Sequence, residues 1–149
     1  MDNGVDFILN ETQSHSDEIK IIYNYCSKNS IPFVLSIYLD ENLKLLSGET
    51  LYEMLPIILE HGPLAIGINC ILPSVFNAVK KDFEYNWGYY LNCGSGNPED
   101  EVIQCGFSPE EYSVIVKKSL ELNPSFIGAC CGSGPDHIKK IKEVLDEKN

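Results

Sequence analysis

The sequence alternates between short apolar runs and amphipathic stretches, and this alternation constrains the fold more than any other feature. Each apolar run is followed, after a few residues, by apolar side chains at helical spacing. Parallel strands need long crossover connections, usually helices, so such a repeat is typical of one parallel sheet. We therefore predict an α/β fold with five parallel strands, at Val5–Asn10, Phe33–Leu39, Leu64–Asn69, Trp87–Leu91 and Phe126–Ala129.

Start and stop signals locate the helices between these strands. Ser108–Glu111 matches a capping box with proline at the first helical position. His61-Gly62 is typical of a helix end, and Asn92–Asp100 of a glycine-rich loop. We predict helices that begin near Ser14 or Ser16, after Gly48–Leu51, at Pro73, after Ser108 (to about Leu122), and at Pro135 (to Glu147).

Two closures of such a sheet are consistent with the pattern: an open doubly wound sheet, or part of a (β/α)₈ TIM-type barrel. A complete barrel needs about 250 residues, so 149 residues accommodate about five of its eight units. In both architectures ligands bind at the carboxyl ends of the strands. The residues that follow each strand are therefore the first candidates for a functional site.

Charge and composition exclude several classes of function. The net charge of −11 argues against nucleic acid or an anionic membrane as partner, because both need a basic surface. No apolar run approaches the roughly 18 residues of a membrane-spanning helix, and the first residues lack the features of a secretory signal. We expect a single cytoplasmic domain over residues 1–149, in which the six cysteines serve a metal or chemistry rather than disulfides.

Three of the cysteines follow predicted strands. Cys70 ends Ala65–Cys70, and Cys130 and Cys131 end Phe126–Cys131. Three thiols at one edge of a sheet would form a soft metal site suited to zinc, with one coordination position left open. Both vicinal cysteines reach one ion only if the strand has ended, and Gly132 allows that turn. The alternatives are two buried cysteines and a loop cysteine, or a redox-labile pair.

The other cysteines and one histidine have weaker indications. Cys26 lies on the apolar stripe of the first helix, where a buried structural thiol is the usual state. Cys93 and Cys105 lie in or beside the glycine-rich loop, and the sequence assigns them no role. His137 lies in the first turn of the last helix, and we expect it at the surface.

Five segments resemble the homocysteine S-methyltransferase family, in family order and over nearly the whole chain. The double cysteine with a distant third is the most specific of these resemblances. The segments are Asp6–Thr12 with Glu18 behind it, Ser47–Leu51, Gly67–Pro73, Tyr90–Gly94 and Gly128–Ile138. The family fold is a (β/α)₈ barrel, and its reaction transfers a methyl group to the thiol of homocysteine, giving methionine.

The resemblance implies a set of site residues. It implies that Cys70, Cys130 and Cys131 hold zinc, that the homocysteine thiol becomes the fourth ligand, and that a small methyl donor binds nearby. Glu11 matches the strand-end glutamate that binds the amino group of homocysteine, although Glu11-Thr12 also suits an ordinary helix entry. Three further residues are candidates for substrate binding, with local backbone bonding as the alternative for the two asparagines: Thr12, Asn69 and Asn92.

The resemblance covers only the C-terminal five units of the family barrel, about strands 4–8. We expect the unpaired edges of such a piece to associate with a complementary N-terminal half or with a second copy. Three functions follow as alternatives: the zinc-bearing part of a methyltransferase, a non-catalytic zinc-binding remnant, or a redox protein with only structural resemblance to the family.

Overall fold

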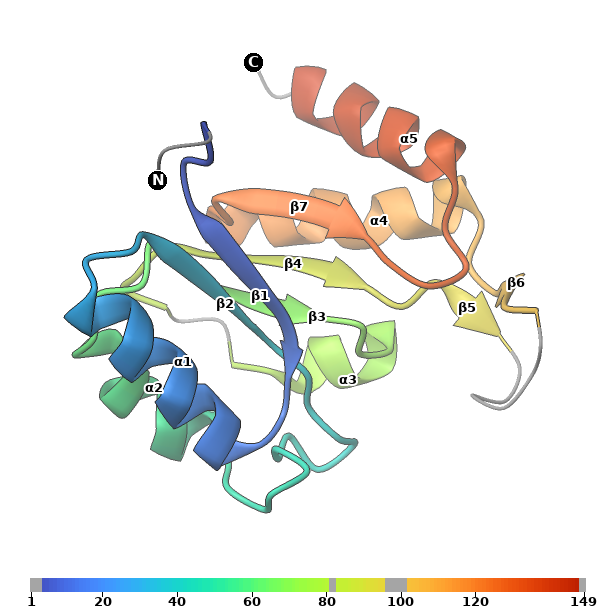
Figure 1. The fold of residues 1–149 in the computed structure, drawn as a ribbon. Coiled ribbons are helices and arrows are strands. Elements are labelled where there is room, and N and C mark those ends of the chain that lie inside the picture. The colour runs from blue at the N-terminus through green and yellow to red at the C-terminus, as the bar shows by residue number, and fades with distance from the viewer. Residues whose placement is uncertain (1–3, 81–82, 96–101, 148–149) are drawn as a thin grey trace.

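The computed structural model describes residues 4–80, 83–95 and 102–147, and their main feature is a five-stranded parallel sheet (Figure 1). Its strand order is β1-β2-β3-β4-β7, and every neighbouring pair is parallel. The predicted α/β class and the five strands are confirmed. The bounds of the strands are β1 Ile8–Gln13, β2 Phe33–Ile37, β3 Ala65–Asn69, β4 Trp87–Leu91 and β7 Phe126–Ala129.

The helices begin at the predicted start signals. In α2 and α4 the N-cap side chain, Thr50 or Ser108, accepts from the backbone of a glutamate that bonds back to the cap. The third and last helices each begin at a proline, which lacks the N–H that would be unpaired there. The helices are α1 Ser16–Lys28, α2 Leu51–Leu59, α3 Pro73–Ala78, α4 Pro109–Ser119, the 3₁₀ turn η1 Leu120–Leu122, and α5 Pro135–Asp146.

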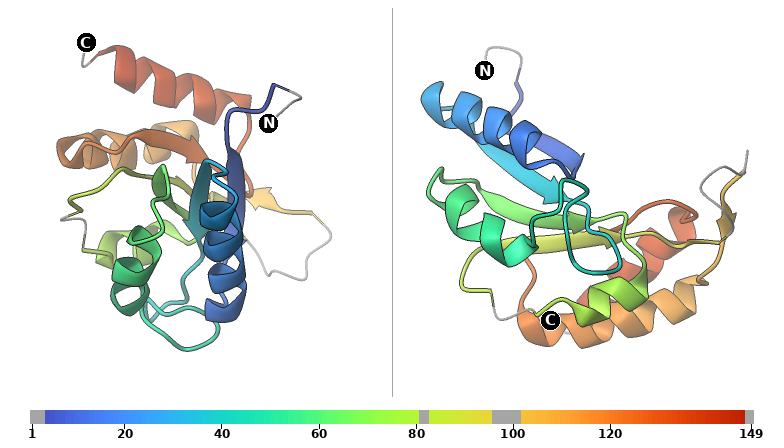
Figure 2. Two further views of the ribbon diagram at one scale, coloured as in Figure 1. Left: turned by 60° about the vertical axis from the view of Figure 1, so that its left-hand side comes forward. Right: turned by 90° about the horizontal axis from the view of Figure 1, so that it is seen from below.

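The helices lie along the outer side of a curved sheet (Figure 2). The strand side chains that face them form the apolar core, in which Trp87 and Tyr89 of β4 pack against Phe76 of α3. The opposite, inner face of the sheet carries small and polar residues, including Ser36, Gly67 and Gly88. Five parallel strands with outer helices are consistent with part of a TIM-type barrel, and the described strands do not close into one.

The first strand is shifted from its predicted position. Pairing with β2 begins at Ile8, opposite Phe33, and β1 continues to Gln13 instead of ending at Asn10. The apolar residues Val5 and Phe7 therefore precede the strand, and they are exposed. The prediction followed the apolar run, whereas β2 determines where pairing starts. The shift places Glu11 and Thr12 inside the strand, at an irregularity in the pairing between Asn10 and Gln13.

The predicted glycine-rich loop contains part of a small hairpin. β5 (Gly94–Ser95) pairs antiparallel with β6 (Gln104–Cys105), and the loop positions from 96 to 100 lie outside the described residues. The Cys93 carbonyl oxygen accepts from the N–H groups of Gly106 and Phe107, which fastens the hairpin to the end of β4. None of the helices in the described ranges is long and apolar enough to cross a lipid bilayer.

Tyr112 of α4 connects the strands β4 and β7 near their carboxyl ends. Its buried hydroxyl donates to the Gly128 carbonyl oxygen at 2.7 Å and accepts from the Leu91 N–H at 3.2 Å. We expect Tyr112→Phe to lower the free energy of unfolding by about 1–3 kcal/mol, because both backbone groups lose a buried partner. Urea denaturation measures the change. Tyr25→Phe, at an exposed tyrosine, is the control and should change little.

Candidate metal centre

Cys70 lies at the carboxyl end of β3, immediately after Asn69. Its backbone N–H donates to the Tyr90 carbonyl oxygen at 3.0 Å, which continues the pairing of β3 with β4 by one residue. Its φ angle is +58°, in the left-handed region that residues other than glycine seldom adopt. Backbone strain of this kind is concentrated at functional sites. The chain turns at Cys70, and its side chain stays at the end of the sheet.

Cys130 and Cys131 follow the last residue of β7, where the strand ends. The Cys130 N–H donates to the Leu91 carbonyl oxygen at 2.8 Å, and the Cys131 carbonyl oxygen accepts from the Cys93 N–H at 2.7 Å. Gly132 then turns the chain with a φ angle of +76°. Because the strand has ended, the two neighbouring side chains are free of the alternation that would send them to opposite faces.

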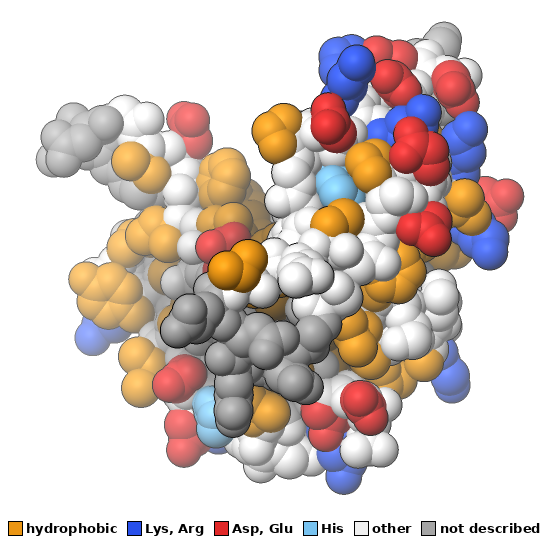
Figure 3. Space-filling model, turned by 90° about the vertical axis from the view of Figure 1, so that its right-hand side faces the viewer, with side chains coloured by type: hydrophobic (Ala, Val, Ile, Leu, Met, Phe, Trp, Pro, Cys, Tyr) orange, Lys and Arg blue, Asp and Glu red, His pale blue; other side chains and the backbone are white. Residues whose placement is uncertain are grey.

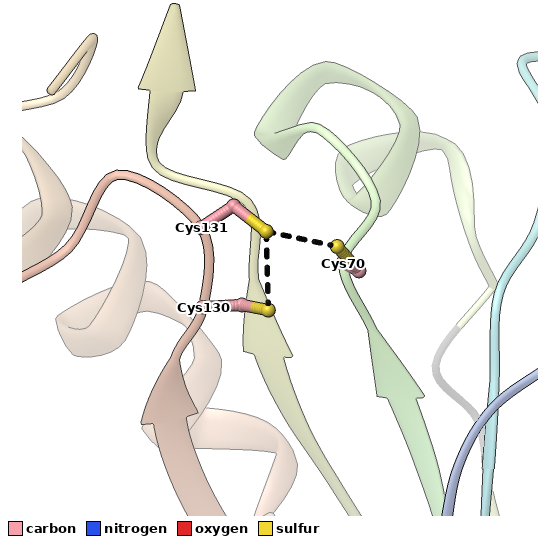
Figure 4. Close-up of side chains that lie close together, drawn as sticks. All are labelled: Cys70, Cys130 and Cys131. Carbon is pink, nitrogen blue, oxygen red and sulfur yellow. Dashed lines mark hydrogen bonds between the residues drawn. The ribbon is translucent and has the colours of Figure 1, made fainter. Parts of the chain in front are cut away.

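The three cysteine sulfurs converge across the end of β4 (Figure 4). The Sγ atoms of Cys70 and Cys131 are 3.5 Å apart, and those of Cys130 and Cys131 are 3.8 Å apart. Tetrahedral Zn–S bonds of about 2.3 Å place sulfur atoms about 3.8 Å from one another. Within the described residues this is the one cluster of His, Cys, Asp and Glu side chains close enough to share an ion.

Burial and the neighbouring thiols disfavour the thiolate forms of Cys70 and Cys130 when no cation is bound. Burial raises the pKa of the Cys70 thiol far above its usual range, and the Cys131 and Cys130 thiols raise it further. Burial likewise raises the pKa of Cys130. Since the thiolate is the metal ligand, metal binding must release protons. The affinity of the cluster for a metal ion should therefore fall as the pH falls.

Asn69 connects the candidate substrate residues of β1 to the cysteine end of β3. Its amide nitrogen donates to Thr12 Oγ1 at 2.8 Å, and its amide oxygen accepts from the Thr12 N–H at 3.1 Å and from Ser36 Oγ at 2.8 Å. Asn69 is 1% exposed, so its amide is occupied by protein groups. Thr12 has a φ angle of +57°, and these bonds hold that strained residue in place. Both residues serve the framework around the site.

Asn92 and two of the cysteines line a pocket of about 580 Å³ at the strand ends. The Asn92 side-chain oxygen accepts from the Gly94 N–H at 2.7 Å, which is the local bonding weighed as its alternative role. The other lining side chains are mainly apolar, from the β2–α2, β3–α3 and β5–β6 segments, with the carboxylate of Glu41 among them. Figure 3 views the molecule from this end of the strands, with hydrophobic side chains near its middle.

A second pocket, of about 590 Å³, lies at the amino ends of β3 and β4, next to Leu64 and Asn86. It is at the opposite end of the strands from the cysteines. The pocket beside the cysteines is therefore the relevant one, because ligands of parallel sheets bind at the carboxyl ends.

Two residues on the inner face of the sheet lie near the site and were not predicted from the sequence as site residues. Ser36 of β2 is buried beside Asn69, and Tyr90 of β4 lies close enough to the Glu11 carboxylate and the Cys130 thiol to be affected by both. The alternation of side chains along β4 could have indicated Tyr90, because Trp87 and Tyr89 face the helices and Tyr90 must then face the inner side of the sheet. Glu11 itself is exposed on β1, at the rim of this inner face.

The remaining cysteines and His137 differ in their exposure to solvent. Cys26 is buried in the core, as predicted. Cys93 is also buried, whereas Cys105 is exposed with its Sγ 3.8 Å from His137 Nε2. The predicted surface position of His137 is wrong, since only 4% of it is exposed. Its Nδ1 accepts from the Gly134 N–H and its Nε2 donates to the Phe107 carbonyl oxygen, so the segment before α4 covers the ring.

The parallel sheet and its thiol cluster define an α/β protein with a candidate three-cysteine metal centre at the strand ends. The family model for homocysteine S-methyltransferase matches residues 1–145. The chain therefore belongs to the homocysteine S-methyltransferase family, as the motifs predicted.

Two curated relatives are similar over most of this chain. Homocysteine S-methyltransferase 2 of Arabidopsis thaliana is 24% identical over 154 residues, which cover 97% of this chain and 46% of the relative. Homocysteine S-methyltransferase 3 of Zea mays is 26% identical over 155 residues, with the same coverage of both chains. The chain spans about half the length of these relatives.

Proposed function

We propose that this chain is the zinc-bearing, C-terminal part of a homocysteine S-methyltransferase barrel, with Cys70, Cys130 and Cys131 as the zinc ligands. The observation that carries the proposal is the convergence of the three sulfurs in a member of this family. The donor set fits the ion, because three soft thiolates suit zinc and leave one position for a substrate. When bound, zinc supplies the charge that lowers the pKa of a coordinated thiol toward neutrality.

The residues of this chain would bind and orient the thiol substrate. Glu11 would accept hydrogen bonds from the ammonium group of homocysteine, a charge-assisted contact at the rim of the inner face. Asn69 would hold the Glu11–Thr12 segment of β1 at a fixed distance from Cys70, through its bonds to Thr12. The pocket that Asn92 lines is large enough for a small methyl donor, and we propose a sulfonium or ammonium compound as that donor.

The open sheet suggests that further barrel units are needed to complete the fold. The outer edges of β1 and β7 pair with no described strand, and Phe7 and Leu9 expose apolar surface at the β1 edge. Unpaired strand edges favour association. We propose that a complementary N-terminal barrel half covers them, since five strands and three make eight, whereas two copies of this chain would bring ten.

Elemental analysis of protein purified without oxygen or chelator tests the metal centre. We expect about one zinc per chain, with the ion retained through gel filtration. Protein with intact free thiols and no zinc, even after incubation with the metal, would contradict the proposal at its first step.

Methionine formation tests the catalytic part. We expect little activity from the chain alone and a clear gain when an N-terminal barrel half from a family member is added. A zinc-loaded chain that binds such a half and still forms no methionine would support the non-catalytic, zinc-binding alternative.

A further inference from the structure

Tyr90 has a buried hydroxyl oxygen without a hydrogen-bond partner among the described residues. Its neighbour Tyr89 points to the other face of the sheet, where its hydroxyl is 2.6 Å from Ser119 Oγ. Buried polar atoms are nearly always hydrogen-bonded, and leaving one unpaired is costly. An orphaned phenol oxygen on the inner face therefore points to a ligand that supplies the missing bond.

The strand pairing places Tyr90 beside the candidate metal centre. Tyr90 pairs with Asn69 in β3 and with Gly128 in β7, so it lies between the two strands that carry the cysteines. Gly128 makes room for it, because a Cβ there would lie 3.1 Å from the Tyr90 Cβ. The Phe126 ring also packs against it, with ring centroids 6.5 Å apart. The phenol ring is thus held at the inner face, on the strand between those that end in the cysteines.

The charges around Tyr90 select the kind of ligand. Burial raises the pKa of Tyr90 and the Glu11 carboxylate and Cys130 thiol raise it further, while the Ser36 hydroxyl acts in the opposite direction. The groups near Tyr90 are therefore a carboxylate and the cysteines, which become anionic when they bind a metal as thiolates. A carboxylate ligand would be repelled there. A primary ammonium group carries three N–H donors, so it can bond Glu11 and the phenol oxygen at the same time.

We propose that Tyr90 Oη accepts a hydrogen bond from the ammonium group of the thiol substrate, beside the Glu11 carboxylate, and so makes the site selective for amino-bearing thiols. The hydroxyl proton of Tyr90 then points to the Glu11 carboxylate, which satisfies both groups in the bound state. This inference rests on the proposed function and deepens it, since it adds a second group to the recognition of the substrate amine.

Calorimetric titration of the zinc-loaded chain with three thiols tests the inference: homocysteine, its analogue without the carboxylate, and its analogue without the amino group. Tyr90→Phe keeps the ring and its packing and removes only the hydroxyl. We expect it to weaken binding of the two amino-bearing thiols by roughly tenfold or more, the usual effect of losing a bond to a charged group. Binding of the analogue without the amino group should be unchanged.

Tyr89→Phe is the matched control, since it removes a neighbouring hydroxyl from the helix-facing side and should alter the relative affinities of the three thiols little. Equal weakening of all three thiols by Tyr90→Phe, or no weakening of any, would overturn the role of Tyr90 alone. Failure of the unaltered zinc-loaded chain to bind homocysteine would overturn the proposed function and this inference with it.

Discussion

Replacing Cys70 by serine is expected to abolish stable zinc binding. Cys70 is the single thiol that β3 contributes, and it lies 3.5 Å from the Cys131 sulfur. A serine hydroxyl is a poor substitute for a thiolate at neutral pH. Loss of a residue that only supports a ligand costs about 10–100-fold in metal affinity, so loss of a ligand should cost more than about 100-fold. Competition with a chromophoric chelator measures the affinity.

Cys105→Ser is the control for this experiment. Cys105 is exposed and lies outside the three-cysteine cluster, so its replacement should leave about one zinc per chain. Unchanged zinc content in Cys70→Ser would show that the ion, if bound, is held elsewhere. Both zinc-based functions would then fail, and a redox role for the cysteines would become the better explanation.

Gly132→Ala is expected to have a large effect on both stability and zinc binding. Gly132 has a φ angle of +76°, and an added Cβ would lie 2.4 Å from Gly94 Cα and 2.6 Å from Gly94 N. The left-handed conformation alone costs about 1–2 kcal/mol for an L-residue, and neither backbone can yield without displacing Cys131. We expect a loss of stability of about 3 kcal/mol or more together with weakened zinc binding.

The same loop provides the control for this substitution. Gly134 has an extended backbone, and a Cβ added there would have no atom within 4 Å, so Gly134→Ala should be tolerated. Urea denaturation and zinc analysis of the two variants make the comparison. If Gly132→Ala retained both wild-type stability and one zinc per chain, the close approach of this turn to Gly94 would not be needed to position Cys131.

Much of the fold followed from local patterns. The strand β4 and the start of α4 were located because a buried strand reads as a continuous apolar run and a capping box marks a helix start. The left-handed geometry of Thr12 was not foreseeable, because it depends on hydrogen bonds to Asn69, 57 residues away. His137 was misplaced for a similar reason, since the segment before α4 that covers it is 30 residues distant in sequence.

The sequence by itself determined the class of fold, the family and which three cysteines are the candidate metal ligands. It could do so because strand–helix alternation and the residues within each motif are local properties. Only the tertiary structure decided how closely the sulfurs of Cys70 and Cys131 approach, and that no group in the described part of the chain bonds the Tyr90 hydroxyl. Both depend on the register of β3, β4 and β7, which places residues that are distant in the chain side by side. That register is fixed when the apolar faces of several strands pack together, so it depends on segments that are far apart in the sequence.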